Sequence, residues 1–157
     1  MEFSLQRNDA VNFLQEHPVG VLTTLNAAMI PESSAIYFAA DAGFSCLFTT
    51  KTQTRKFSNI QNGSPAVILS FSEGKLASAE IQGTIEVIVD AVEIARAIEL
   101  FNTIVASRKM GYWVPPIAQI EAGEYVVCRL VPKTVRFNQF AHAFGDGDDA
   151  RQAVFEL

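Results

Sequence analysis

One segment of the chain combines residue types that bind phosphate groups. It contains the hydroxyls of Thr49, Thr50 and Thr54, and the cations Arg55 and Lys56 directly follow Thr54. Hydroxyls donate hydrogen bonds to phosphate oxygens, an arginine fork matches those oxygens in geometry, and a lysine adds a point charge. Both cations fall in the first turn of a predicted helix, where they oppose the helix dipole, so their presence needs a reason that a bound anion would supply. The segment therefore predicts a phosphate site, and a solvated polar loop is the alternative that these residues leave open.

The sequence lacks the residue patterns of several common enzyme classes. It contains no GxSxG, HExxH or GxGxxG pattern, and its two histidines, His17 and His142, are too few for a histidine-rich metal site. His17 comes at a predicted helix end, where a structural role is the simpler interpretation. Glu80 and Glu86 alternate along a predicted strand and are interpreted as its solvated face. No catalytic acid or base is assigned, and no metal is expected.

Composition restricts the class of protein. At 157 residues, with 49% hydrophobic and 18% charged residues, the chain fits one domain with a substantial core. Its formal net charge of −5 argues against binding to nucleic acid. No apolar run approaches the ~20 residues of a membrane span, and the first residues lack the features of a signal peptide. Cys46 and Cys128 are predicted to be reduced, buried thiols of a cytoplasmic protein, and no pattern supports a disulfide between them.

Hydrophobic periodicity predicts the elements that position the phosphate segment. Helical spacing predicts one helix over residues 4–16, with Asn8 or Asp9 as its cap, and another over 91–107, capped by Asp90. A short helix is expected to begin after Thr54 and to end at residues 62–63. β-Branched and alternating runs predict six strands, over residues 19–25, 33–40, 44–50, 65–72, 78–89 and 125–137.

The arrangement of these elements predicts the fold class. Consecutive strands without alternating helices indicate a mainly β, antiparallel fold with flanking helices. Short strands must protect their edges, which favours closure into a small barrel. Gly83 indicates a bend or bulge in its strand, and Pro132 indicates an edge, a bulge or a bend. The twelve phenylalanines suggest a core rich in phenylalanine. We expect a single domain over residues 1–157, with a flexible tail over about residues 143–157.

The order of the elements, together with four sequence stretches, resembles the pyridoxamine 5′-phosphate oxidase-like family, which has the FMN-binding split-barrel fold. The resemblance covers residues 5–140, and the combined order and spacing carry it rather than any single stretch. The stretches are residues 20–25 with Pro31 and 34–38, Phe48-Thr49 with Thr54-Arg55-Lys56, residues 59–62 with 65–67, and residues 129–132 with Phe137.

The resemblance implies a homodimer with FMN sites at the subunit interface. The residues that would hold the ribityl phosphate are Thr49, Thr54, Arg55 and Lys56, with Thr50 and Lys51 in the same loop. The backbone of Ser34, Ala35 and Ile36 would lie along the flavin ring, and Ser78 falls near a polar contact to the flavin. From the partner subunit, residues around Trp113 or Asn138 would close the site, although a lone tryptophan is more often a core or dimer contact.

Departures from the family pattern limit the activity that the resemblance implies. Ser34 stands where pyridoxamine-phosphate oxidases have an arginine, Asn138 stands where they have a tryptophan, and their basic C-terminal substrate motif is missing. We therefore do not expect oxidation of pyridoxamine phosphate. The leading hypothesis is an FMN-dependent oxidoreductase with an unknown small-molecule substrate and hydride transfer at the flavin. The alternative is a non-catalytic dimeric split barrel that binds flavin, deazaflavin or haem, or no ligand; scarce histidines disfavour haem.

Overall fold

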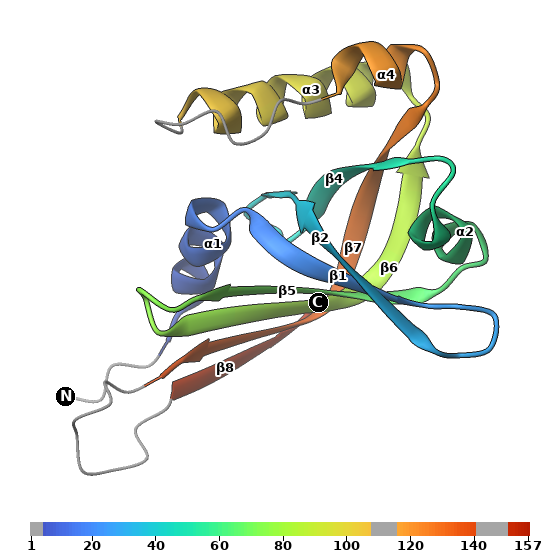
Figure 1. The fold of residues 1–157 in the computed structure, drawn as a ribbon. Helices are drawn as coiled ribbons and strands as arrows, with labels where there is room; N and C mark the ends of the chain where they lie inside the picture. Colours follow the sequence, from blue (N-terminus) through green and yellow to red (C-terminus); the bar gives the residue numbers. More distant parts are fainter. Residues whose placement is uncertain (1–4, 108–115, 141–150) are drawn as a thin grey trace.

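The computed structural model describes residues 5–107, 116–140 and 151–157. Eight strands and four helices lie in these residues (Figure 1). The helices are α1 (Arg7–Glu16), α2 (Arg55–Gln61), α3 (Ala91–Ala106) and α4 (Ile117–Glu121). The strands are β1 (Val19–Leu25), β2 (Pro31–Tyr37), β3 (Ala39–Ala40), β4 (Cys46–Lys51), β5 (Pro65–Ser72), β6 (Ala77–Ile88), β7 (Tyr125–Gln139) and β8 (Arg151–Glu156).

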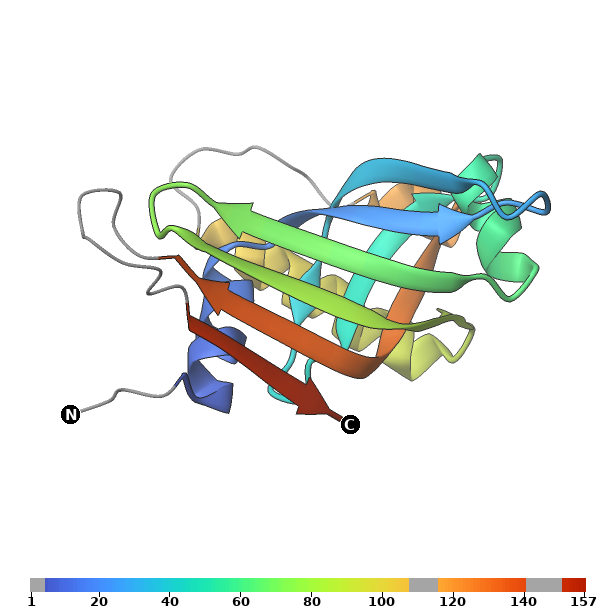
Figure 2. The ribbon, with the colours of Figure 1, turned by 90° about the horizontal axis from the view of Figure 1, so that it is seen from below.

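The strands form one antiparallel sheet that curls into a split barrel, which confirms the predicted fold class (Figure 2). The strand order is β2-β1-β5-β6-β7-β4-β3, and β8 pairs with β7. β2 and β3 lie at opposite ends of this order, yet Phe38 alone separates them in the chain. The chain itself therefore brings the two ends of the sheet together. β7 pairs with β6 along its length, with β4 over residues 125–130 and with β8 over residues 134–139.

A β-bulge lies where β7 passes from β4 to β8. The pairing of β6 with β7 shifts between Gln82 and Gly83, so that Gly83 faces Pro132 and Lys133 has no counterpart on β6. A Cβ atom at residue 83 would overlap the carbonyl oxygen of Val131. Only glycine allows the two backbones to approach so closely. A bulge was one of the alternatives that Gly83 and Pro132 each indicated, and the two residues belong to a single bulge between neighbouring strands.

Phenylalanine side chains dominate the barrel core, as the composition suggested. Phe38, Phe44 and Phe48 are fully buried, and α1 contributes Phe13 to the same cluster. A second, smaller cluster forms where α3 packs on the sheet, with Phe101 fully buried at its centre. Burial of large aromatic side chains supplies much of the stabilisation of a small barrel.

The helix ends agree in part with those predicted from the sequence. Asp90 caps α3, because its carboxylate accepts a hydrogen bond from the Glu93 amide at 2.9 Å. The predicted cap of α1 at Asn8 or Asp9 is wrong, because Gln6 is the N-cap residue. Asp9 lies three positions later and accepts from the Gln6 amide at 2.7 Å, the arrangement of a capping box. His17 ends α1 with its ring centroid 4.7 Å from that of Phe13, in keeping with a structural role.

The structure corrects three expectations. The strand predicted over 33–40 begins at Pro31 and divides into β2 and β3, and the short helix α4 was not predicted. The flexible tail is wrong for residues 151–156, which form β8. β8 is held by pairing with β7 and by the ring of Phe155, which stacks on Phe44 at 5.6 Å. Such long-range contacts outweigh the acidic, glycine-rich sequence that precedes the strand.

No helix among the described residues has the length and apolarity needed to cross a bilayer. Within the same residues, no group of three or more metal-ligating side chains comes together.

Candidate functional site

Threonine side chains shape the corner where β4 turns into α2. Thr54 is the N-cap residue of α2, and its hydroxyl accepts from the Phe57 amide at 3.3 Å and donates to the Lys51 carbonyl at 2.9 Å. The buried Thr50 hydroxyl lies 3.3 Å from that of Thr54. Much of the hydrogen-bonding capacity of the Thr54 hydroxyl is thus used within the turn. Thr54 fixes the turn from which Arg55 projects.

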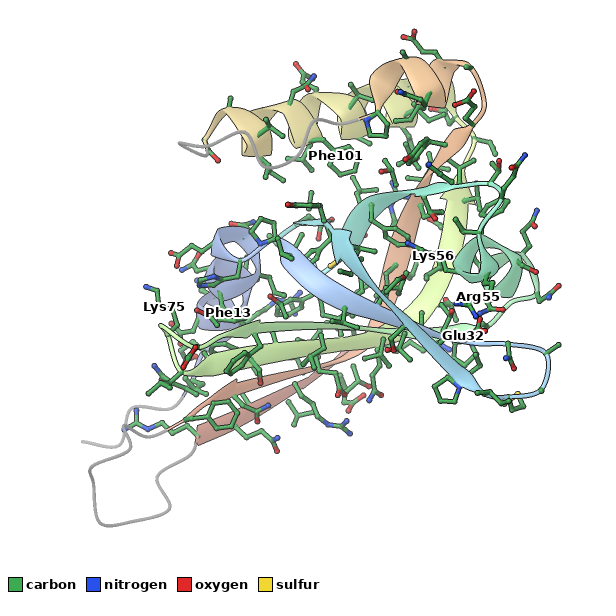
Figure 3. All side chains as sticks on the ribbon, viewed as in Figure 1. Phe13, Glu32, Arg55, Lys56, Lys75 and Phe101 are labelled. Atoms are coloured by element: carbon green, nitrogen blue, oxygen red, sulfur yellow. The ribbon has the colours of Figure 1, made fainter. Side chains whose placement is uncertain are left out.

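Arg55 meets a carboxylate that the sequence analysis did not identify. Its Nη1 atom lies 3.5 Å from Oε1 of Glu32, a residue of β2 (Figure 3). The Arg55 side chain is 87% exposed and that of Glu32 only 22%. The other Glu32 oxygen accepts from the amide of the buried Asn59 at 2.9 Å, and the same amide donates to Thr24 at 3.0 Å. The corner therefore contains two cations and an internal carboxylate.

Lys56 is half-buried beside Arg55 on α2. Burial lowers the pKa of its ammonium group, and the nearby Cys128 thiol partly offsets this effect. Among the described residues, no salt bridge to Lys56 is formed. A half-buried cation without an ion-pair partner is costly, and an anion bound at the corner would reduce that cost.

The other predicted residues of the loop separate onto two faces of β4. The buried Thr50 faces the barrel interior, whereas Thr49 and Lys51 occupy the alternate positions and lie on the opposite face. The Lys51 ammonium lies 5.7 Å from the centre of the Tyr125 ring. The structure thus brings Thr50, Thr54 and the two cations of α2 to one corner and directs Lys51 elsewhere.

Three consecutive residues of β2 were expected along the flavin ring. Ser34 shares the inward face with Glu32, and its hydroxyl oxygen is buried without a hydrogen-bond partner among the described residues. Ile36 lies on this face too and is buried in the core, whereas Ala35 is exposed on the outer face. An unpaired buried hydroxyl in a native structure requires a partner or a function. Ser34 therefore offers a free polar group on the face that also carries Glu32.

Ser78 lies at the other end of β6. The start of β5, next to α2, pairs with Thr84, whereas Ser78 pairs with Phe71 near the far end of β5. The Ser78 hydroxyl accepts from Asn138 at 3.4 Å. Within one chain these two residues are therefore not part of the corner. Trp113 lies outside the described residues.

The acidic residues of β6 form ion pairs in the described structure. Glu80 contacts Arg136 at 3.1 Å, and Glu86 contacts Arg129 at 2.8 Å, where Arg129 also reaches Glu93 of α3 at 2.9 Å. Each carboxylate has its own arginine, so Glu80 and Glu86 do not form an acid–base pair.

Two cavities lie away from the two cations of α2. One, of about 500 Å³, lies beside α1 and is lined by residues that include Phe13 and Phe137. The other, of about 370 Å³, lies beside the bulge at Gly83 and touches Thr24. Neither has Arg55 or Lys56 in its lining, so the candidate site is identified by its polar side chains rather than by a cavity.

Sequence reasoning missed Glu32 and gave Asn59 no role. The alternation of residues 32, 34 and 36 along β2 was the signal available for Glu32, because it places all three on one face. Contact with Arg55 depends on how β2 and α2 meet in the barrel, which no local pattern contains.

Comparison with known proteins agrees with the split-barrel fold. The chain resembles the haem-binding protein from Mycobacterium smegmatis at 17% identity and a TM-score of 0.70, over 99% of this chain and 60% of the other. It thus spans less than two thirds of that protein. It also resembles the FAD- and haem-binding protein from Mycobacterium smegmatis, at 16% identity and a TM-score of 0.69, over 98% of this chain and 83% of the other.

A third similar structure is a Clostridium acetobutylicum protein related to general stress protein 26, of the pyridoxinephosphate oxidase family. It shares 12% identity and a TM-score of 0.65, over 98% of this chain and 97% of the other. Among curated proteins, none matches. At such identities the solved structures show the fold, whereas the pyridoxamine 5′-phosphate oxidase model matches the sequence itself over residues 7–139. The chain therefore belongs to the pyridoxamine 5′-phosphate oxidase family.

Proposed function

We propose that the protein binds FMN at the corner between β4 and α2 and acts as a flavin-dependent oxidoreductase on a small molecule. The observation that carries the proposal is the half-buried Lys56, which has no ion-pair partner among the described residues and stands next to the exposed Arg55. A phosphate group would give this cation a partner and accept hydrogen bonds from the Arg55 fork. We propose that both cations contact the same phosphate.

The residues of the corner fit such a ligand in two further respects. Thr54 holds the turn through its hydrogen bond to the Lys51 carbonyl at 2.9 Å, so the backbone that carries Arg55 is ordered in advance. The buried, unpartnered hydroxyl of Ser34 supports contact with a polar edge of the flavin along β2. α2 has only seven residues, so we assign the affinity to side chains rather than to a helix dipole.

When bound, FMN would supply hydride transfer at its N5 atom. The residues of this chain would bind the phosphate, orient the ring along β2 and exclude water with the apolar barrel wall. We assign no residue to proton transfer.

We also propose a homodimer with the cofactor sites at its interface. Val19 and Val21 of β1 lie beside Leu69 and Phe71 of β5 on the outer face of the sheet, and all four are exposed, at 42–59%. Contiguous exposed apolar side chains of this size are typical of an interaction surface. A partner covering this face would bury them. The two buried, unpaired thiols support a reducing, cytoplasmic location.

The test begins with the visible spectrum of the purified protein and mass spectrometry of the molecule released on denaturation. Flavin bands with FMN released would support the proposal, whereas a Soret band or a colourless protein that does not bind added FMN would favour the non-catalytic alternatives. Light scattering at micromolar concentration then distinguishes a dimer from a monomer.

Affinity for FMN tests the corner itself. Arg55→Ala/Lys56→Ala removes both cations and should weaken FMN binding by about 1.5–3 kcal/mol for each charge-assisted hydrogen bond to the phosphate. The matched control is Lys75→Ala/Arg96→Ala, which removes the same charge from exposed positions outside the corner. Equal affinity in the first variant and the wild type would remove the phosphate site from the proposal.

A further inference from the structure

Glu32 introduces a negative charge at the point where the proposed phosphate would bind. Its carboxylate lies on the inward face of β2, opposite the buried Thr24 of β1, and reaches Arg55 at 3.5 Å. A fixed anion at an anion site is unfavourable unless it has a separate role, because like charges in contact repel strongly where solvent is partly excluded. The Arg55–Glu32 ion pair therefore requires an explanation, because it places a carboxylate at a site proposed to bind phosphate.

The two partners of this ion pair are held very differently. The Glu32 carboxylate is mostly buried and accepts a 2.9 Å hydrogen bond from Asn59, which is itself only 5% exposed. The Arg55 side chain is 87% exposed, and its single 3.5 Å contact is longer than a strong charge-assisted hydrogen bond. Arg55 can therefore exchange one anionic partner for another at little cost, whereas Glu32 stays in place.

We propose that Glu32 is a specificity-determining residue that competes with the ligand's phosphate for Arg55. Binding of a phosphate would draw Arg55 away from Glu32, whose 3.5 Å contact is weak, and would bring a second anion close to the carboxylate. The competition lowers affinity for dianionic phosphate esters and leaves affinity for the uncharged part of the ligand unchanged. The inference rests on the proposed function, since it concerns the same corner, and it names the charge of the ligand as the property that Glu32 discriminates.

FMN and riboflavin provide the test, because they differ only in the phosphate. Glu32→Gln removes the charge and retains an amide oxygen that can accept from Asn59. We expect this variant to bind FMN about fivefold more tightly than the wild type at low salt, with riboflavin affinity unchanged. The gain should shrink as salt screens the repulsion. Glu73→Gln is the control, because it removes one carboxylate from the exposed turn between β5 and β6.

A second variant tests whether local misfolding, rather than loss of the charge, changes the affinity. Glu32→Ala should change FMN affinity in the same direction, and circular dichroism of both variants should match the wild type. Unchanged or weaker FMN binding in folded Glu32→Gln would overturn the inference, while the effect of Arg55→Ala/Lys56→Ala would still support the FMN site. An equal gain for riboflavin would also overturn it, because the effect would then not depend on phosphate.

A titration with inorganic phosphate tests the role of Glu32 independently of flavin binding. The side-chain Nε signal of Arg55 in ¹⁵N NMR should shift at a lower phosphate concentration in Glu32→Gln than in the wild type. If neither protein binds FMN, the proposed function fails, and this titration decides the inference alone. Equal titration midpoints for the wild type and Glu32→Gln, or no shift of the Arg55 signal in either protein, would overturn the inference.

Discussion

Gly83 of β6 lies so close to the carbonyl oxygen of Val131 on β7 that no other residue fits without backbone movement. Gly83→Ala should therefore lower the free energy of unfolding by about 1–3 kcal/mol, the usual cost of overpacking. Urea unfolding measures the difference. Gly74→Ala is the matched control, because a Cβ there meets no atom within 4 Å, and it should change stability little. Equal stability of Gly83→Ala and the wild type would show that the bulge tolerates a side chain.

The cap of α2 should be measurable by a threonine-to-alanine change. Thr54→Ala removes a hydroxyl that accepts from the Phe57 amide at 3.3 Å and donates to the Lys51 carbonyl at 2.9 Å. We expect a loss of about 1 kcal/mol in the free energy of unfolding and weaker FMN binding, because the turn that carries Arg55 loosens. Thr54→Ser keeps the hydroxyl and should retain most of the stability and most of the affinity for FMN. Equal losses in the two variants would assign the effect to the methyl group instead.

The two thiols should be inert while the protein is folded. Burial raises the pKa of Cys128 to about 12, and burial, followed by the charge of Asp41, raises the pKa of Cys46 even further. Because the thiolate is the reactive form, neither should react with Ellman's reagent at about pH 8. Denaturant should release both. Rapid reaction of either thiol in the folded protein would contradict the buried positions described here.

Lys56 should make stability depend on pH in the alkaline range. Burial lowers its pKa in the folded protein below the ordinary 10.5. At pH values between the lowered pKa and 10.5, the unfolded chain therefore binds more protons than the folded protein. Stability contributed through Lys56 therefore rises with pH across that window. The difference in unfolding free energy between the wild type and Lys56→Met should move in favour of the wild type as pH increases from about 8 to about 11. A flat difference curve would mean that the ammonium group is hydrated in the folded protein.

Strands and helix ends with strong local signals could be predicted from the sequence. The β-branched runs gave the bounds of β1 and β5 as the structure has them, and Asp90 marked the start of α3. β8 was missed because its residues alternate only weakly and follow an acidic, glycine-containing sequence, so pairing with β7 decides its conformation. The short α4 carries no cap that a sequence pattern could identify.

The candidate site could be predicted only in part. Thr54, Arg55 and Lys56 are neighbours in the chain, so their grouping needed nothing beyond a turn and a helix start. Glu32 of β2 reaches Arg55 of α2, and this contact depends on the curvature of the sheet, which is a global property. The separation of Ser78 from the corner likewise depends on strand register, which is set by long-range pairing.

β7 has a neighbouring strand on both sides along most of its length, whereas β2 has a sheet neighbour on one side only among the described residues. β3 and β8 share this property, so thermal fluctuations should release the amide protons of these three edge strands to solvent before those of β7. The protons shared between β6 and β7 should persist the longest, and their exchange should report the opening of the whole molecule. Unfolding would thus start at the sheet edges, among them the strand that bears Glu32, and finish where β6 pairs with β7.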